Sequence, residues 1–142
     1  MKSLLATTAA LLALTAPAFA ESHSAGDAAK GEKDYGKCKA CHMIVAPDET
    51  VIMKGGKTGP NLYGIVGRAA GSVEGFKYGS GLVDAGAAGL IWTEENIAAY
   101  IVDPKGFLTE TLGAPAKANM AKQNLKAPAD VAAYLASVAP AN

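Results

Sequence analysis

Two cysteines and a histidine within five residues constrain this chain more than any other feature. Cys38 and Cys41 are separated by two residues, and His42 follows directly. A Cys-x-x-Cys-His run is the pattern of a c-type haem attachment site. Two thiols at this spacing can each add to one vinyl group of the porphyrin, and the neighbouring imidazole can then ligate the iron. The chain has 2 Cys in total, and both lie in this run.

Other uses of a Cys-x-x-Cys pair have to be weighed. A thioredoxin-like redox pair expects a βαβ context, which does not follow residues 38–41. A zinc site would need a second pair of ligands, and the only other histidine is His23. A disulfide across two intervening residues would close a strained loop. The run therefore predicts covalent haem, with Cys38 and Cys41 as attachment points and His42 as the proximal iron ligand.

Residues 1–20 have the pattern of an export signal. Lys2 gives a short positive start, residues 4–16 are apolar, and residues 17–20 end in a small-x-small cleavage site. We expect cleavage after Ala20, which leaves residues 21–142 as one domain in the periplasm. The alternative is an uncleaved membrane anchor, for which the apolar run is short. We therefore expect no stable membrane insertion.

Composition narrows the class of protein further. Aromatic residues make up 6% of the chain, so its apolar core is thin for its length, and a buried porphyrin would add apolar area. The chain holds 13 Lys and Arg against 13 Asp and Glu, and the export signal contains one of the lysines. The mature chain is then almost neutral, which argues against a nucleic acid as its partner.

Helix signals recur along the chain, and no convincing strand is found. Asp27 is a good N-cap, and Thr93 opens another capped helix, with Pro104 just beyond its end. We expect helices at residues 27–37, 61–66, 93–101 and 131–138. Glycine-rich stretches at residues 79–81 and 86–89 are predicted to separate the helices. The first and last helices are expected to cross at Gly31, because a glycine permits close approach. The fold class is therefore all-α.

Further blocks follow the haem motif in an order that is specific as a set. They are residues 57–62, 66–68, 76–78, 92–96 and 104–107, then Met120 and residues 134–135. Together with residues 38–42 they resemble the class I cytochromes c, and among these the bacterial cytochrome c2 branch. The resemblance covers residues 26–138. It implies the class I cytochrome c fold, in which helices wrap around one covalently bound haem c.

The resemblance also implies a distal iron ligand. The family places this ligand just before the last helix, where the chain has Met120. Met43 adjoins the proximal histidine, and Met53 lies in the loop that follows it. A weakly donating thioether opposite an imidazole raises the reduction potential. Relatives usually carry an aromatic residue shortly after the methionine, whereas residues 121–124 contain none. A surface or core methionine remains the alternative.

Four more residues are implied to support the haem. The carbonyl of Pro60 would accept the ring N–H of His42 and orient the imidazole; the alternative is an ordinary turn proline. The polar tips of Arg68, Tyr78 and Trp92 would hydrogen-bond a buried propionate, since a buried carboxylate requires donors. For the two aromatic residues the alternative is core packing, and for Arg68 it is a plain surface charge.

The function implied is one-electron transfer, not catalysis. By resemblance, a monomer would take electrons from a cytochrome bc complex and pass them to a photosynthetic reaction centre or a terminal oxidase. A small peroxidase-like haem enzyme and a gas-binding haem sensor are the alternatives. Both need an open or displaceable sixth position on the iron, which Met120 would occupy.

Lysines are expected to surround the exposed edge of the haem. By resemblance they are Lys37, Lys39, Lys54, Lys57, Lys105, Lys117, Lys122 and Lys126. A positive face of this kind could steer docking onto acidic membrane complexes, and a mixed solvated surface is the alternative. We place Lys30 and Lys77 away from this edge.

Overall fold

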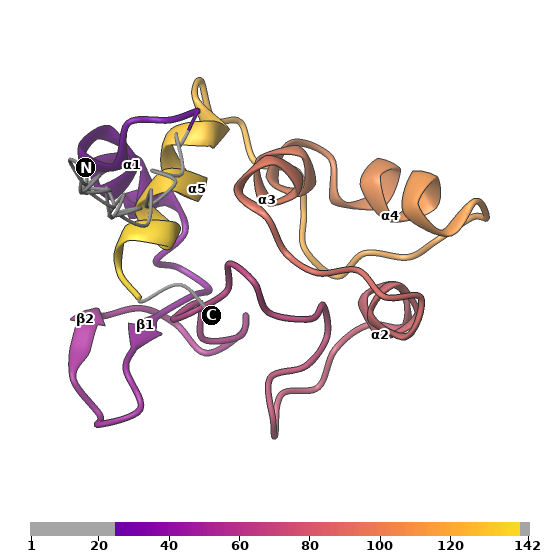
Figure 1. The fold of residues 1–142 in the computed structure, drawn as a ribbon, viewed down its shortest axis with the longest axis horizontal. Helices are drawn as coiled ribbons and strands as arrows, with labels where there is room; N and C mark the ends of the chain where they lie inside the picture. Colours follow the sequence, from indigo (N-terminus) through magenta and orange to yellow (C-terminus); the bar gives the residue numbers. More distant parts are fainter. Residues whose placement is uncertain (1–24, 140–142) are drawn as a thin grey trace, which may run out of the picture.

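The computed structural model describes residues 25–139, which form short helices joined by long connecting segments (Figure 1). The export signal predicted at residues 1–20 lies outside this range. The elements in chain order are α1 (Ala28–Asp34), η1 (Tyr35–Lys37), β1 (Ile44–Val45), β2 (Val51–Met53), α2 (Ser80–Ala87), α3 (Glu94–Val102), α4 (Pro104–Leu112) and α5 (Pro128–Ser137). Among the described residues, no helix combines the length and apolar character needed to span a membrane.

Helices α1 and α5 cross at one end of the molecule, as the sequence predicts (Figure 1). A Cβ atom on Gly31 would lie 1.8 Å from the carbonyl oxygen of Asp130, so the crossing requires glycine. The rings of Tyr35 and Tyr134 meet edge to face, with centroids 5.6 Å apart. These contacts hold the N-terminal and C-terminal helices together.

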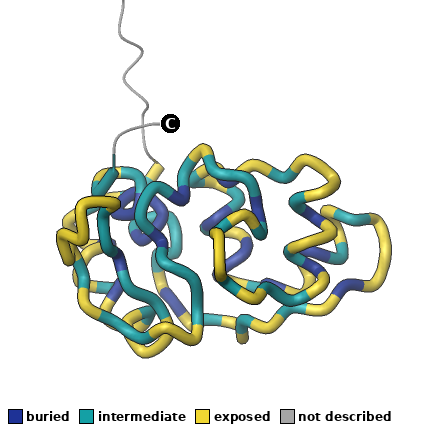
Figure 2. The backbone as a smooth tube through the Cα atoms, turned by 90° about the horizontal axis from the view of Figure 1, so that it is seen from below, coloured by how far each residue is buried: buried dark blue, intermediate teal, exposed yellow. Residues whose placement is uncertain are grey.

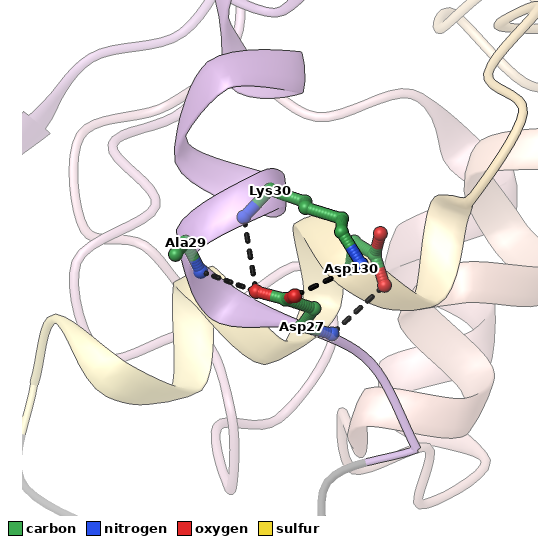
Figure 3. A network of polar contacts seen from close by, with 4 residues as sticks. All are labelled: Asp27, Ala29, Lys30 and Asp130. Carbon is green, nitrogen blue, oxygen red and sulfur yellow. Dashed lines mark hydrogen bonds and ion pairs between the residues drawn. The ribbon is translucent and has the colours of Figure 1, made fainter.

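The start of α1 is tied to α5 by polar contacts (Figure 3). The Asp27 carboxylate accepts hydrogen bonds from the backbone N–H groups of Ala29 and Lys30, at 3.0 and 3.1 Å. It also pairs with the Lys30 ammonium at 3.0 Å. The backbone N–H of Asp27 in turn donates to the Asp130 carboxylate at 2.8 Å. Asp27 is therefore the expected N-cap, and it is itself fixed by the last helix.

A capping box opens α3. The Thr93 hydroxyl accepts from the Asn96 N–H at 3.2 Å, and the Asn96 side chain accepts from the Thr93 N–H at 2.7 Å. Pro104 lies just beyond the end of this helix, as the sequence predicts, and it also begins α4, with the Asp103 side chain as N-cap. Proline is well suited to the first helical position because the N–H that it lacks has no partner there.

Three sequence expectations are wrong. Residues 79–81 and 86–89 are not separators but parts and ends of α2, which packs against α4; tertiary contacts override the low helix propensity of glycine. The sequence predicts no strand, but residues 43–60 contain an antiparallel hairpin that pairs Ile44 with Met53. Residues 61–66 form no helix, because the Asn61 side chain accepts from the backbone N–H groups of Val45 and Tyr63.

The buried residues form one cluster that reaches both halves of the molecule (Figure 2). Near α3 and α4, the rings of Trp92, Tyr100 and Phe107 lie in mutual contact, with centroids 5.1 to 6.1 Å apart. Near α1 and α5, Tyr35 and Val131 are almost fully buried. The walls of the site described next come from both halves.

Candidate haem site

A cavity of ≈ 410 Å³ is lined by residues from both parts of the buried cluster. Tyr35 and Val131 come from the part near α1 and α5, and Trp92 and Tyr100 come from the part near α3 and α4. All eight side chains that the sequence singled out lie on its wall: Cys38, Cys41, His42, Pro60, Arg68, Tyr78, Trp92 and Met120. Apolar side chains supply much of the remaining surface, including Leu62, Ile65, Ile97 and Leu135. The fold therefore gathers distant parts of the sequence around one largely apolar space.

The Cys-x-x-Cys-His run forms a tight turn at the end of η1. The carbonyl of Cys38 accepts from the backbone N–H groups of both Cys41 and His42, at 3.1 and 2.9 Å. Cys38 is half-buried and Cys41 is exposed, and the two form no disulfide with each other. Burial, assisted by the nearby Asp34, raises the pKa of the Cys38 thiol to about 11.

A backbone carbonyl fixes the ring of His42. Its Nδ1 lies 2.9 Å from the carbonyl oxygen of Pro60. Because a carbonyl can only accept, Nδ1 carries the proton, and Nε2 is left with a free lone pair. Burial lowers the pKa of the imidazole, although the hydrogen bond to Pro60 acts in the opposite direction. The ring is thus held neutral in the tautomer that a metal ligand needs.

Met120 is the methionine that reaches the cavity. Of the methionines in the described residues, Met43 and Met53 do not line it. Met53 belongs to β2 and packs against the buried cluster. Met120 is half-buried in the long segment between α4 and α5. A thioether and a neutral imidazole are therefore both available to a metal held in this space.

Arg68 is anchored on the cavity wall and is not a plain surface charge. Its two terminal nitrogens donate to the carbonyl oxygens of Tyr63 and Asn61, at 2.9 and 3.1 Å. Burial lowers the pKa of the guanidinium. An arginine has five N–H donors, so the two carbonyls leave further donors for a carboxylate.

The two aromatic candidates have different surroundings. The Tyr78 hydroxyl accepts a long hydrogen bond from the Val73 N–H at 3.4 Å, and burial raises its pKa. Trp92 stacks on Phe107 and meets Tyr100 edge to face. Core packing, the alternative weighed for Trp92, is therefore present, and its indole also lines the cavity.

Two tyrosines on the wall were missed as site residues. The hydroxyls of Tyr35 and Tyr100 are buried and have no hydrogen-bond partner among residues 25–139. Burial raises the pKa of Tyr100 to about 12. Buried hydroxyls normally have a partner, so these two fit a wall that a bound group completes. The sequence predicts Tyr35 as a packing residue where the first and last helices cross, and Tyr100 as a residue of the helix at 93–101. Nothing in its pattern marks a hydroxyl left without a partner.

Of the lysines expected around the haem edge, Lys37 and Lys117 line the cavity and the others do not. Lys77 also lines it, so the expectation that Lys77 lies away from this edge is wrong. The segment from Phe76 to Gly79 runs along the wall, which helix patterns alone do not reveal. Lys122 pairs with Asp103, and Lys30 pairs with Asp27.

The residues fit a haem. The apolar wall suits a porphyrin face, the two thiols suit its vinyl groups, and the guanidinium of Arg68 suits a propionate. His42 and Met120 offer the nitrogen and sulfur donors that haem iron accepts in electron-transfer proteins. The orphaned hydroxyls of Tyr35 and Tyr100 are consistent with a group that fills the space.

Comparison with known proteins decides the family. No protein-family model matches the chain. Cytochrome c2 of Rhodobacter capsulatus is 58% identical over 137 residues, which cover 96% of each chain. The chain belongs to the class I c-type cytochromes of the c2 branch. Cytochrome c-550 of Paracoccus denitrificans is 50% identical over 143 residues, covering 99% of this chain and 90% of that protein.

Solved structures of this family share the fold. The structure of Rhodobacter capsulatus cytochrome c2 superposes with a TM-score of 0.78 at 60% identity, covering 80% of this chain and 98% of that one. Ferric cytochrome c-550 of Paracoccus versutus also gives 0.78, at 53% identity, covering 81% and 99%. As a c2-branch cytochrome, the chain carries covalently bound haem c and is an electron carrier, not an enzyme.

Proposed function

We propose that this cytochrome is a periplasmic one-electron carrier whose haem iron is ligated by His42 and Met120. The observation that carries the proposal is the shared cavity wall, on which one neutral imidazole, one thioether and two thiols meet. Cys38 and Cys41 would form the thioether bonds to the porphyrin. The bound haem would supply the redox chemistry, since its iron accepts and releases one electron.

His42 and Met120 would both stay bound to the iron in both oxidation states. Pro60 holds the His42 ring in one orientation through the Nδ1 hydrogen bond, which makes the imidazole a better donor. The thioether of Met120 would donate weakly and raise the reduction potential. With no vacancy at the iron, neither a peroxide nor a gas molecule could bind, which argues against the peroxidase-like enzyme and the gas sensor.

The propionate groups of the haem would require hydrogen-bond donors from the protein. A propionate drawn into an apolar wall costs free energy unless donors meet it. Arg68 is already anchored at the wall by two carbonyls, with donors to spare. Tyr78 and Trp92 line the same cavity. We assign these three residues to the inner propionate.

The proposed location and partners rest on the sequence and the charged surface. Residues 1–20 would direct export, and residues 21–142 would mature in the periplasm as a monomer. Lys37, Lys77 and Lys117 on the cavity wall give its mouth a positive character. This face would receive electrons from a cytochrome bc complex and deliver them to a photosynthetic reaction centre or a terminal oxidase, each by transient docking.

Spectroscopy of the purified protein tests the closed site. The ferric protein should show the weak near-infrared band of a methionine-to-iron bond. The ferrous protein should bind no carbon monoxide at neutral pH. Acid–acetone extraction should leave the haem on the polypeptide. A ferric protein without this band, together with ready binding of carbon monoxide, would favour the enzyme or the sensor.

A further inference from the structure

The segment that carries Met120 is tied to the rest of the protein on either side of the methionine. Before it, the Ala116 N–H donates to the Thr109 hydroxyl of α4 at 3.2 Å. After it, the Gln123 N–H donates to the Ile101 carbonyl of α3 at 3.0 Å. Within the described range 25–139, residues 117–121 make no hydrogen bond to another element. Ala118 and Met120 pack against the buried cluster, so this packing and the two flanking ties together hold Met120 in position.

An ion pair strengthens the second tie. The Lys122 ammonium lies 3.0 Å from Oδ2 of Asp103. The other oxygen of that carboxylate, Oδ1, accepts from the Gly106 N–H at 3.1 Å and so caps α4. One oxygen of the Asp103 carboxylate thus caps α4, and the other binds Lys122 of the methionine segment.

Asp103 is a firm anchor. It stands between the end of α3 and the start of α4, and the next residue, Pro104, is almost fully buried. Its cap on α4 fixes the orientation of the carboxylate. Lys122, in contrast, is on the irregular segment and 71% exposed. Breaking the ion pair would therefore free the segment and leave the helix junction in place.

We propose that Asp103 is a positioning residue that, through Lys122, limits how often the Met120 segment moves away from the iron. The inference rests on the proposed assignment of Met120 as the distal ligand. Each opening of the segment must break the ion pair together with the hydrogen bond between Gln123 and Ile101. Exposed pairs of this kind contribute modestly, so loss of the pair should speed opening about two- to five-fold.

Imidazole binding to the ferric holoprotein measures the opening. At saturating imidazole the binding rate equals the rate at which Met120 leaves the iron. Lys122→Gln and Asp103→Asn should each raise this limiting rate about two- to five-fold. Asparagine is itself a good N-cap, so Asp103→Asn removes the charge and keeps the cap on α4. Lys122→Arg should retain the rate of the unaltered protein.

A matched control lies in the same segment. Lys126 is exposed and has no ion pair among residues 25–139, so Lys126→Gln removes an equal charge without removing the tie. Its limiting rate should equal that of the unaltered protein. Salt should speed opening of the unaltered protein, because it screens exposed pairs, and should have little effect on Lys122→Gln. Equal acceleration by Lys126→Gln would overturn the proposal.

A double variant shows whether the two substitutions act through the same ion pair or independently of each other. Asp103→Asn with Lys122→Gln should open no faster than either single variant, because one interaction is removed once. Additive acceleration in the double variant would overturn the proposal, as would single variants with unaltered rates.

The same set of proteins separates this inference from the proposed function. If the near-infrared band persists in Met120→Ala, the ligand assignment fails. If the band disappears in Met120→Ala while Asp103→Asn and Lys122→Gln keep the unaltered opening rate, the ion-pair inference alone fails.

Discussion

At the scale of single residues, the imidazole of His42 is closely confined by the backbone of residues 59 and 60. The Pro60 carbonyl accepts its Nδ1–H at 2.9 Å. A Cβ atom on Gly59 would lie 2.3 Å from Cε1 of the same ring. No side chain fits between the backbone at residue 59 and the ring. The glycine and the proline of this turn therefore act together on the His42 ring.

We expect Gly59→Ala to displace the His42 ring. Overpacking of this kind typically costs about 1–3 kcal/mol, which would appear in the free energy of unfolding of the holoprotein by guanidinium. The reduction potential should change as well, since the ring would turn relative to the iron. Gly36→Ala is the control, because nothing lies within 4 Å of a Cβ atom at that position. Equal behaviour of the two variants would contradict this account of the turn.

The site residues differ in how well the sequence predicts them. Cys38, Cys41 and His42 are predictable because haem attachment fixes their spacing. Tyr35 and Tyr100 are not, because their role depends on hydroxyls buried without a partner, which is a property of the folded cavity. Lys77 was misplaced for a related reason, since it lies on an irregular segment whose path follows tertiary contacts.

At the scale of elements, side-chain caps predict helix starts reliably, whereas a proline does not show whether a helix ends or begins there. Asp27 and Thr93 open helices as predicted, because a cap satisfies particular backbone N–H groups. Pro104 can end one helix or start the next, and Asp103 as its cap decides the outcome. The hairpin of β1 and β2 escaped detection because its strands are very short and its turn has Glu49, not glycine, at φ 67°.

The Asp27 cap should make the crossing of α1 and α5 sensitive to acid. The hydrogen bond from the Lys30 side chain, followed by the backbone N–H of Lys30, lowers the pKa of Asp27 below its ordinary value of 3.8. A lowered folded-state pKa stabilises the fold above 3.8, and this contribution is lost as the pH falls through the folded value. We expect Asp27→Asn to lower the free energy of unfolding near neutral pH and to have less effect in strong acid.

Denaturant titrations across this pH range check the prediction. Asp84→Asn serves as the control, because Asp84 makes no ion pair among the described residues. An Asp27→Asn effect that is the same at every pH would show that capping alone, without the carboxylate charge, accounts for the role of Asp27.

At the scale of the whole molecule, the net charge is close to zero while three lysines face the cavity. Lys37, Lys77 and Lys117 lie on its wall, and the full chain balances 13 basic against 13 acidic residues. The local field at the cavity mouth can therefore be positive although the molecule as a whole is not. Docking of an acidic partner would depend on this local arrangement.

Reversal of Lys117 to Glu should lower the association rate with an acidic redox partner several-fold at low salt. It should also flatten the dependence of that rate on salt, because screening shortens to about 10 Å near 0.1 M. Lys33→Glu, on the exposed side of α1 and away from the cavity, should matter less. Stopped-flow rates over a range of salt concentrations measure both effects. Rates that stay flat with salt in the unaltered protein would indicate docking governed by apolar contact.

The central claim is that Met120 closes the iron site, and paired methionine variants test it most directly. Met120→Ala should abolish the near-infrared band of the ferric protein, lower its reduction potential and admit carbon monoxide to the ferrous iron. Met53→Ala, which removes a methionine that packs on the core outside the cavity, should leave all three properties unchanged. A Met120→Ala protein that keeps the band and excludes carbon monoxide would contradict the account.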